Sequence, residues 1–147
     1  MYVLWVGIGC KRETSRELIE LAIKEIFRKH DLSESAIAGI ATINSKAAEV
    51  GLLELCQIRN LPLKTFPAEV LQNISVPNPS QLVEKKVGTA SVAEAAAISA
   101  SLDFSHVNFA DLKVGGINNL LIPKQIFRSS NPNLQGIVTI AVVMIGK

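Results

Sequence analysis

Residues 2–16, YVLWVGIGCKRETSR, decide the fold class of this chain. The run Tyr2–Ile8 is rich in β-branched and aromatic residues and is apolar on both alternating faces, which is typical of a central strand covered by helices on both sides. The stretch that follows, Gly9–Glu13, predicts a turn. Thr14 and Glu17 then stand at capping-box spacing, so we expect a helix with Thr14 as its N-cap.

The rest of the chain continues this alternation of strands and helices. Ile37–Ile43 is a second buried strand, and a strand–helix–strand order predicts a right-handed parallel crossover. From the remaining patterns we expect a helix over Gly51–Arg59, a weak edge strand over Leu61–Phe66, helices starting at Asn78 and Ser91, an irregular loop over Asp103–Asn118, and a final hairpin of Asn119–Ile122 and Ile137–Val143. The sequence therefore predicts a single α/β domain over residues 1–147, with three α/β/α layers around a mixed, mostly parallel sheet of about five strands.

The composition excludes several classes of protein. A hydrophobic fraction of 48% beside a charged fraction of 19% excludes intrinsic disorder. The formal net charge of +2 is too small for a nucleic-acid binder, which would carry a basic stripe or patch. No uninterrupted apolar run reaches about 18 residues, so we expect no membrane span. The two cysteines make no disulfide framework, and His30 and His106 lie far apart with no cysteine at ligand spacing, so we expect a cytoplasmic protein without a metal site.

The turn after the first strand has the residues of an anion cradle. Gly9 lets a ligand approach the backbone closely, and the helix behind it presents unpaired N–H groups. Lys11 and Arg12 add positive charge, and Thr14 and Ser15 add hydroxyls, which together suit a carboxylate or a phosphate. An ordinary turn with solvated basic side chains accounts for the same residues, and their spacing does not separate the two interpretations.

Two further features follow the predicted strands. Lys46 and Glu49, after the second strand, form either a surface pair or part of a crevice at the carboxyl ends of the strands, and the pattern favours the surface pair. Cys10 and Arg16 have the spacing of a phosphate-loop thiol phosphatase, but no glycine separates them and Glu13 would repel a phosphate. We therefore interpret Cys10 as a small buried residue at a packing point and keep the phosphatase as a minor alternative.

Taken in order along nearly the whole chain, several blocks resemble the C-terminal domain of the cobalt-precorrin hydrolase CbiG and the free-standing CobE proteins. The first blocks surround the two predicted strand ends, and the later ones follow the predicted helix starts and the last two strands. They are Gly7–Arg12 with Thr14 and Ser15, Ala41–Glu49, Gly51–Leu55, Val76–Ser80, Val87–Ala97, Leu121–Gln125 and Val138–Ala141.

The resemblance implies a role in building the corrin ring of cobalamin. The two-part CbiG enzymes open a δ-lactone on cobalt-precorrin-5A and release acetaldehyde, whereas CobE proteins belong to the aerobic route. Because only the C-terminal module is matched, the chain resembles either a CobE-like protein or a piece of a longer fusion. We expect it to bind a polycarboxylate corrinoid intermediate, and either to take part in this C–C bond hydrolase reaction or only to carry the intermediate.

The resemblance also implies partners and site residues. We expect either other cobalamin-pathway enzymes or a fused N-terminal domain as protein partners, with cobalt only as part of the substrate and no cofactor. Glu49 is the candidate base, whereas Glu94 fits better as a capping-box residue after Ser91. The expected substrate-binding residues are Gly9, Cys10, Lys11, Arg12, Thr14, Ser15, Lys46, Glu49, Asn78, Ser80, Gly88, Thr89, Ser91 and Lys124.

Overall fold

A computed structural model of the chain describes residues 2–72, 92–105, 120–134 and 136–146. Within these ranges the elements run in the order β1 (Tyr2–Cys10), α1 (Arg16–Lys29), β2 (Ile37–Ile43), α2 (Val50–Arg59), β3 (Leu63–Phe66), α3 (Ala68–Gln72), α5 (Val92–Ser105), β4 (Leu120–Arg128) and β5 (Ile137–Gly146). Two short 3-10 turns, Glu34–Ala36 and Asn44–Lys46, lie on either side of β2. None of the described helices is long and apolar enough to cross a lipid bilayer.

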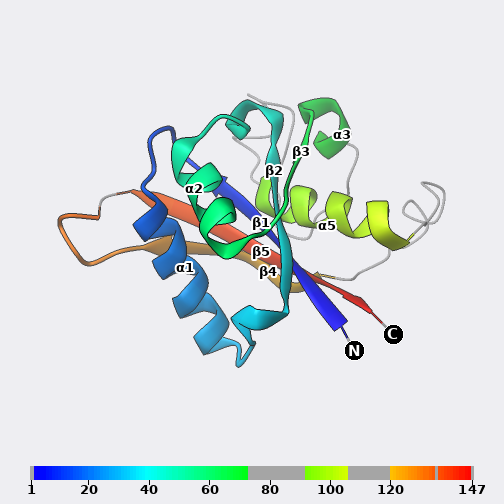
Figure 1. Cartoon of the computed structure of the whole chain (residues 1–147), viewed down its shortest axis with the longest axis horizontal. Coiled ribbons are helices and arrows are strands. Elements are labelled where there is room, and N and C mark those ends of the chain that lie inside the picture. The colour runs from blue at the N-terminus through cyan, green and yellow to red at the C-terminus, as the bar shows by residue number, and fades with distance from the viewer. Residues whose placement is uncertain (1, 73–91, 106–119, 135, 147) are drawn as a thin grey trace.

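The strands form one sheet of five in the order β3-β2-β1-β5-β4 (Figure 1). β1 pairs with β2, and β2 with β3, in parallel, whereas β5 pairs antiparallel with both β1 and β4. The predicted mixed α/β sheet is confirmed. Among the described strands, β1, β2, β3 and β4 run in one direction and β5 runs against them, so the expected mostly parallel sheet is confirmed as well.

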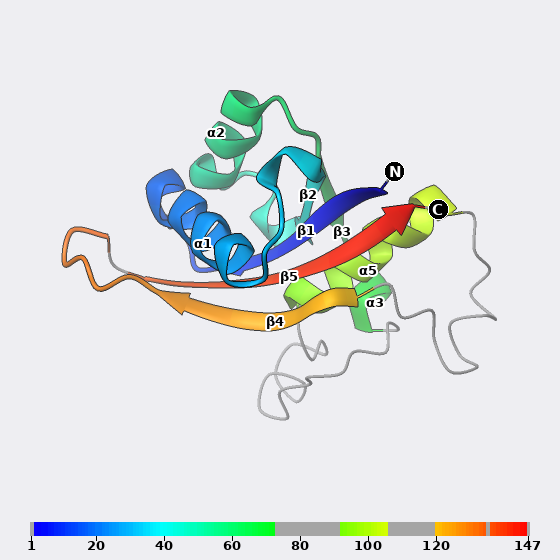
Figure 2. The same cartoon turned by 90° about the horizontal axis from the view of Figure 1, so that it is seen from below.

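Helices cover both faces of the sheet, as Figure 2 shows, with α1 and α2 on one side and α3 and α5 on the other. The core under α1 and α2 is built mainly from large aliphatic side chains and the buried Phe27. The core under α5 is built mainly from alanines of that helix, packed against Trp5 and Val143. The central position of β1 explains why its sequence is apolar on both alternating faces.

The start of α1 differs from the prediction by one residue. The Ser15 hydroxyl accepts a hydrogen bond from the Leu18 N–H at 3.1 Å, so Ser15, and not Thr14, is the N-cap. The Thr14 hydroxyl instead donates to the Lys11 carbonyl oxygen at 2.7 Å. Serine and threonine can both cap a helix. The turn before α1 decides which of the two hydroxyls accepts a hydrogen bond from a backbone N–H of the first helical turn.

Four other elements extend beyond the predicted boundaries, and one of them is β5, which ends at Gly146 and not at Val143. β1 continues to Cys10 because β5 pairs with it as far as Val138. β4 continues from the predicted end at Ile122 to Arg128, with Pro123 tolerated because β4 is an edge strand. α5 continues to Ser105, so the first part of the expected irregular loop is helical. The helix expected at Asn78 lies outside the described residues.

Candidate functional site

The carboxyl ends of β1 and β2 bring predicted site residues from two loops together. These strands are parallel neighbours, so the turn after Cys10 and the segment after Ile43 meet at one edge of the sheet. Cys10 is half-buried there, within the electrostatic influence of Lys46 and Glu49 and beside the Thr14 hydroxyl. The structure therefore brings the two loops into one region, which the sequence analysis gave as the alternative to a surface pair.

The loop after β1 is a tight turn from Lys11 to Thr14. The Thr14 N–H donates to the Lys11 carbonyl oxygen at 3.3 Å, and Glu13 at the third position has a φ of 64°. A positive φ at this position is usually supplied by glycine. The Glu13 N–H donates to Glu49 Oε1 at 2.8 Å, so the second loop holds the first in this conformation. The surface-pair interpretation of Lys46 and Glu49 is wrong, since no ion pair joins these two described side chains and Glu49 instead binds the turn.

The thiol of Cys10 is kept protonated by its surroundings. Burial raises the pKa of Cys10 above its ordinary value of 9.0. The Lys46 ammonium lowers the same pKa, the Glu49 carboxylate raises it and the Thr14 hydroxyl lowers it, in decreasing order of effect. Since burial dominates, Cys10 is a thiol and not a thiolate near neutral pH. The predicted small, buried Cys10 at a packing point does pack against the core, and its side chain is half-buried there.

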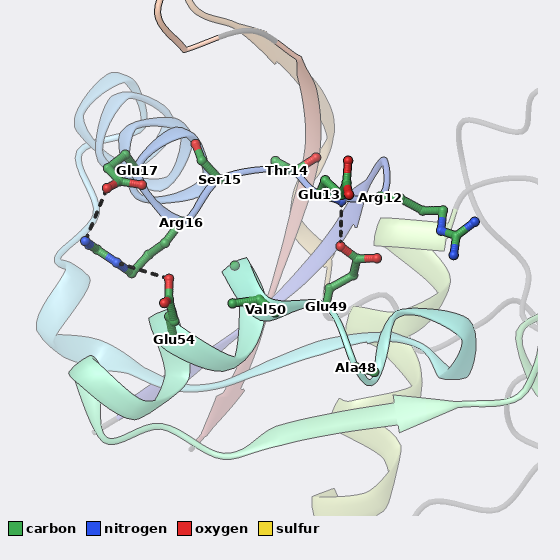
Figure 3. Close-up of a pocket in the computed structure, with 11 residues that line it drawn as sticks. Arg12, Glu13, Thr14, Ser15, Arg16, Glu17, Ala48, Glu49, Val50 and Glu54 are labelled. Carbon is green, nitrogen blue, oxygen red and sulfur yellow. Dashed lines mark hydrogen bonds and ion pairs between the residues drawn. The ribbon is translucent and has the colours of Figure 1, made fainter.

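A first hollow, of about 760 Å³, lies between the turn and the start of α2. Its charged lining residues are two arginines, Arg12 and Arg16, and four glutamates, namely Glu13, Glu17, Glu49 and Glu54. Arg16 forms ion pairs with Glu17 at 3.5 Å and Glu54 at 4.0 Å, and Figure 3 shows the Arg12 guanidinium directed away from them. Because carboxylates outnumber cations, this hollow by itself does not favour a polyanion.

A second hollow, of about 380 Å³, lies between the same turn and the loop that joins β4 to β5. Its charged lining residues are Lys11 and Arg128, and none of the carboxylates in the described part of the chain lines it. Lys11 and Arg12 were expected at one hollow, together with Lys46. The structure instead places Lys11 and Arg12 at different hollows, because consecutive residues leave the tight turn in different directions. Lys46, at the end of the 3-10 turn after β2, lines neither of these two hollows.

Glu94 lies away from these hollows, in the layer between α5 and the sheet. Its side chain is completely buried, and its Oε2 accepts a hydrogen bond from the Lys124 N–H at 2.8 Å. Glu94 therefore joins the helix to the edge strand β4, a role that the capping-box interpretation missed. The flanking alanines were the available signal, because a helix that is apolar all round is buried, including any polar residue on it.

Several expected site residues lie outside the described part of the chain. They are Asn78, Ser80, Gly88, Thr89 and Ser91. Lys124, expected beside the carboxylates of a ligand, lies on β4 with a half-buried side chain. Arg128 was not singled out in the sequence, because only the pairing of β4 with β5 brings it next to the turn after β1. Groups of three or more potential metal ligands are absent among the described residues.

These features define a three-layer α/β protein with a cluster of polar residues at the carboxyl ends of neighbouring parallel strands. The sequence model of the family described as "Cobalamin synthesis G C-terminus" matches residues 4–143. The chain belongs to this family, and the expected resemblance to CbiG and CobE proteins is confirmed.

Individual relatives agree with this assignment. The chain is 33% identical over 96 residues to a cobalt-precorrin-5A hydrolase of Priestia megaterium, and 35% identical over 92 residues to that of Salmonella typhimurium. The matches include 65% and 62% of this chain but 26% of each relative, so the chain spans about a quarter of the length of these hydrolases.

Solved structures show the same fold. The structure of CobE, from the cobalamin biosynthetic pathway, is 25% identical and superimposes with a TM-score of 0.77, covering 99% of this chain and 96% of that one. The cobalamin biosynthesis protein chiG of Agrobacterium tumefaciens is 24% identical, with a TM-score of 0.63 over 99% of this chain and 100% of that one. The second likeness supports the fold alone.

Proposed function

We propose that this chain binds a polycarboxylate corrinoid intermediate of cobalamin biosynthesis at the carboxyl ends of β1 and β2, and contributes to opening the lactone of cobalt-precorrin-5A with release of acetaldehyde. The observation that carries the proposal is the meeting of Cys10, Thr14, Lys46 and Glu49 at this edge. The hydrolase names of the two relatives supply the substrate class.

The spread of the cations suits a ligand with many arms. A corrinoid intermediate carries acetate and propionate groups around a broad macrocycle, so its negative charges lie far apart. Lys11 and Arg12 line different hollows on the two sides of one turn, and Lys46 lies on the neighbouring loop. Cations arranged in this way can form charge-assisted hydrogen bonds with separate carboxylates of one ligand.

Glu49 is the group best placed to activate water for lactone opening. Its Oε1 is held by the Glu13 N–H at 2.8 Å, which orients the carboxylate, while no described group donates a hydrogen bond to Oε2. A carboxylate oxygen in this position can accept a proton from water as the water attacks the lactone carbonyl. Cobalt enters this proposal only as part of the substrate, and no separate cofactor is proposed.

A second candidate function is a carrier that binds the intermediate without converting it. The observation that favours it is the length of the relatives, since three quarters of each hydrolase has no counterpart in the match. In that case, a fused N-terminal domain or a separate enzyme of the pathway would supply the reacting groups.

The test is incubation of the chain with cobalt-precorrin-5A, with binding followed by visible absorbance and acetaldehyde followed by trapping. We expect a spectral change and acetaldehyde with the native chain, and a loss of acetaldehyde in Glu49→Gln. The amide oxygen of that variant can still accept the Glu13 N–H bond, so the turn is retained. Glu54→Gln is the matched control, because Glu54 lines the same hollow but faces Arg16.

Two outcomes separate the candidate functions, and a third tests the role of Glu49. A spectral change without acetaldehyde supports the carrier, and no spectral change at all overturns both functions. A loss of acetaldehyde in Glu54→Gln equal to that in Glu49→Gln contradicts the assigned role of Glu49.

The phosphatase alternative has little support in the structure. A thiol phosphatase needs a thiolate and a nearby arginine for the phosphate. Burial raises the pKa of Cys10, and Arg16 is engaged by Glu17, Glu20 and Glu54. Cys10→Ser, which removes the nucleophile, would abolish a phosphatase.

A further inference from the structure

We infer that the hollow between Lys11 and Arg128 is a carboxylate-binding subsite that holds one acidic arm of the ligand. This inference rests on the proposed function for the identity of the ligand. It adds Arg128, which neither the sequence patterns nor the family resemblance indicated, and it assigns a role to the loop that joins β4 to β5. Figure 1 shows that loop beside the turn from β1 to α1.

The register of the sheet places the two cations on either side of one residue. Cys10 pairs with Val138, so Lys11 directly follows the end of β1 next to Ile137, and Ile137 pairs with Arg128 on the other side. Neighbouring strands lie about 4.8 Å apart, so the two cationic residues are separated by about 10 Å of backbone. Side chains of this length can converge on a single carboxylate between them.

The two side chains also meet at one exposed hollow. Cys10 and Phe127, the residues before Lys11 and Arg128, both pack against the core under α1. Because successive side chains of a strand point to opposite faces, Arg128 on β4 is directed away from that core. Both side chains are exposed and line the same hollow.

The charges in this hollow are unbalanced, unlike those in the first hollow. Within the described residues, neither the Lys11 nor the Arg128 side chain forms an ion pair or hydrogen bond with a carboxylate. The arginines of α1 and α2, in contrast, are engaged by glutamates: Arg16 by Glu20 and Arg59 by Glu34. Two adjacent cations without a counter-charge repel each other, and a bound carboxylate would relieve that repulsion.

The far wall of the hollow is held in shape by its own hydrogen bonds. The Asn131 N–H donates to Ser129 Oγ at 3.0 Å, and the Asn133 N–H donates to Asn131 Oδ1 at 2.9 Å. The Leu134 N–H closes a turn onto the Asn131 carbonyl oxygen at 3.0 Å, and the Leu134 side chain packs against the core. A wall ordered in this way loses little entropy when a ligand binds.

The chemistry of the lining selects the ligand class. An arginine offers a fork of donors that matches the two oxygens of a carboxylate, and a lysine adds a point charge. Ser130 lines the same hollow, and its hydroxyl is of the type that can donate a further hydrogen bond. The hollow is too small for a macrocycle, so it suits an acetate or propionate arm whose ring rests outside it.

The experiment measures binding of cobyrinic acid, a corrinoid with seven carboxylates, and of its heptamethyl ester, by visible absorbance at two salt concentrations. We expect Arg128→Gln and Lys11→Gln each to weaken binding of the acid about tenfold, because each removes charge-assisted hydrogen bonds. The uncharged ester should bind the native chain and both variants equally.

Arg28→Gln is the matched control, because it removes one exposed positive charge near the other end of α1, about 18 Å along the helix from Arg16. If Arg28→Gln weakens binding as much as Arg128→Gln, the effect is one of net charge and the inference is overturned. Unchanged binding in Arg128→Gln and Lys11→Gln also overturns it, while the proposed function stands because the native chain still binds.

A second measurement covers the case in which the native chain binds no cobyrinic acid. Tricarballylate, a small tricarboxylate, is then titrated while the backbone amides are observed by NMR. Shifts at Lys11 and at residues 128–137, lost in Arg128→Gln, support a carboxylate site independent of corrinoids. The absence of such shifts overturns the inference.

Discussion

The two faces of the sheet are covered in different ways. Under α1 and α2, large side chains such as Ile23, Phe27 and Leu52 interlock with the sheet, all of them completely or almost completely buried. Under α5, the helix presents alanines and lies so close that a Cβ atom on Gly7 would meet the Ala93 carbonyl oxygen at 1.9 Å. The first face depends on filled volume, and the second on close approach of the backbone.

This difference determines which substitutions each face can tolerate. A face built on volume is weakened by smaller side chains, and a face built on close approach is weakened by larger ones. The close approach of α5 also brings Glu94 within hydrogen-bond distance of the β4 backbone. The face with the smaller side chains is therefore the one that buries a carboxylate.

The largest expected effect comes from Phe27→Ala on the α1 side. Removing a fully buried ring leaves a cavity, and we expect the free energy of unfolding to fall by about 3–5 kcal/mol. Urea denaturation followed by circular dichroism measures this loss. A loss below about 1 kcal/mol would show that this face can collapse around the cavity and does not depend on volume.

Gly7→Ala tests the α5 side in the opposite direction, by adding one methyl group. The new Cβ would overlap the Ala93 carbonyl oxygen, so α5 must move, at an expected cost of about 3 kcal/mol. Ala22→Gly on α1 is the comparison, because it removes one methyl group where Gly7→Ala adds one. We expect it to lower the free energy of unfolding by about 1 kcal/mol through helix propensity, and further through lost packing. Equal stability of Gly7→Ala and the native chain would refute the close approach.

Glu94→Ala separates the polar contribution of the α5 side from its packing. It leaves the Lys124 N–H without its acceptor, so we expect a loss of about 2 kcal/mol. In Glu94→Gln an amide oxygen can still accept this bond, and the loss should be smaller. Faster hydrogen exchange at the Lys124 amide in Glu94→Ala, but not in Glu94→Gln, would identify this bond as the cause.

The smallest expected effect is a pH dependence on the α1 and α2 side. Burial raises the pKa of Cys56, which packs in that core, from 9.0 to about 11. The folded state then keeps a proton that the unfolded state loses, so the contribution of Cys56 is fully present below pH 9 and is lost as the pH rises towards 11. We expect a loss on the order of 1 kcal/mol across this window.

Cys56→Ala should flatten the stability curve between pH 9 and 11. Cys10→Ala is the comparison at the sheet edge, where the thiol is more exposed and opposing charges act on its pKa. An unchanged slope in Cys56→Ala would mean that other groups produce the loss of stability at high pH.

Much of the fold could be predicted because local patterns agree with tertiary packing. The apolar run of β1, the helical spacing of Ile19, Ala22 and Ile23, and the second apolar run at β2 are all satisfied only in a layered α/β structure. Element ends were harder to predict. Pairing with β5 extends β1 and β4, and such pairing depends on residues more than a hundred positions away from β1.

The candidate site was predicted in part for the same reason. Parallel neighbouring strands must end at one edge, so the meeting of the loops that carry Cys10 and Glu49 followed from strand order. The direction of each side chain did not follow. Lys11 and Arg12 are adjacent and equally charged, yet the turn at Glu13 sends them to different hollows.

The amino-acid sequence by itself determined the α/β class, the helix and strand cores and the family of this protein, because periodicity and ordered motifs are local properties of the chain. Only the tertiary structure decided that Ser15 caps α1, that Glu49 holds the turn after β1, that Glu94 is buried against β4 and that Arg128 joins Lys11. These outcomes depend on distances between atoms of separate helices, strands and loops. Tertiary packing sets these distances, and the spacing of residues along the chain does not specify them.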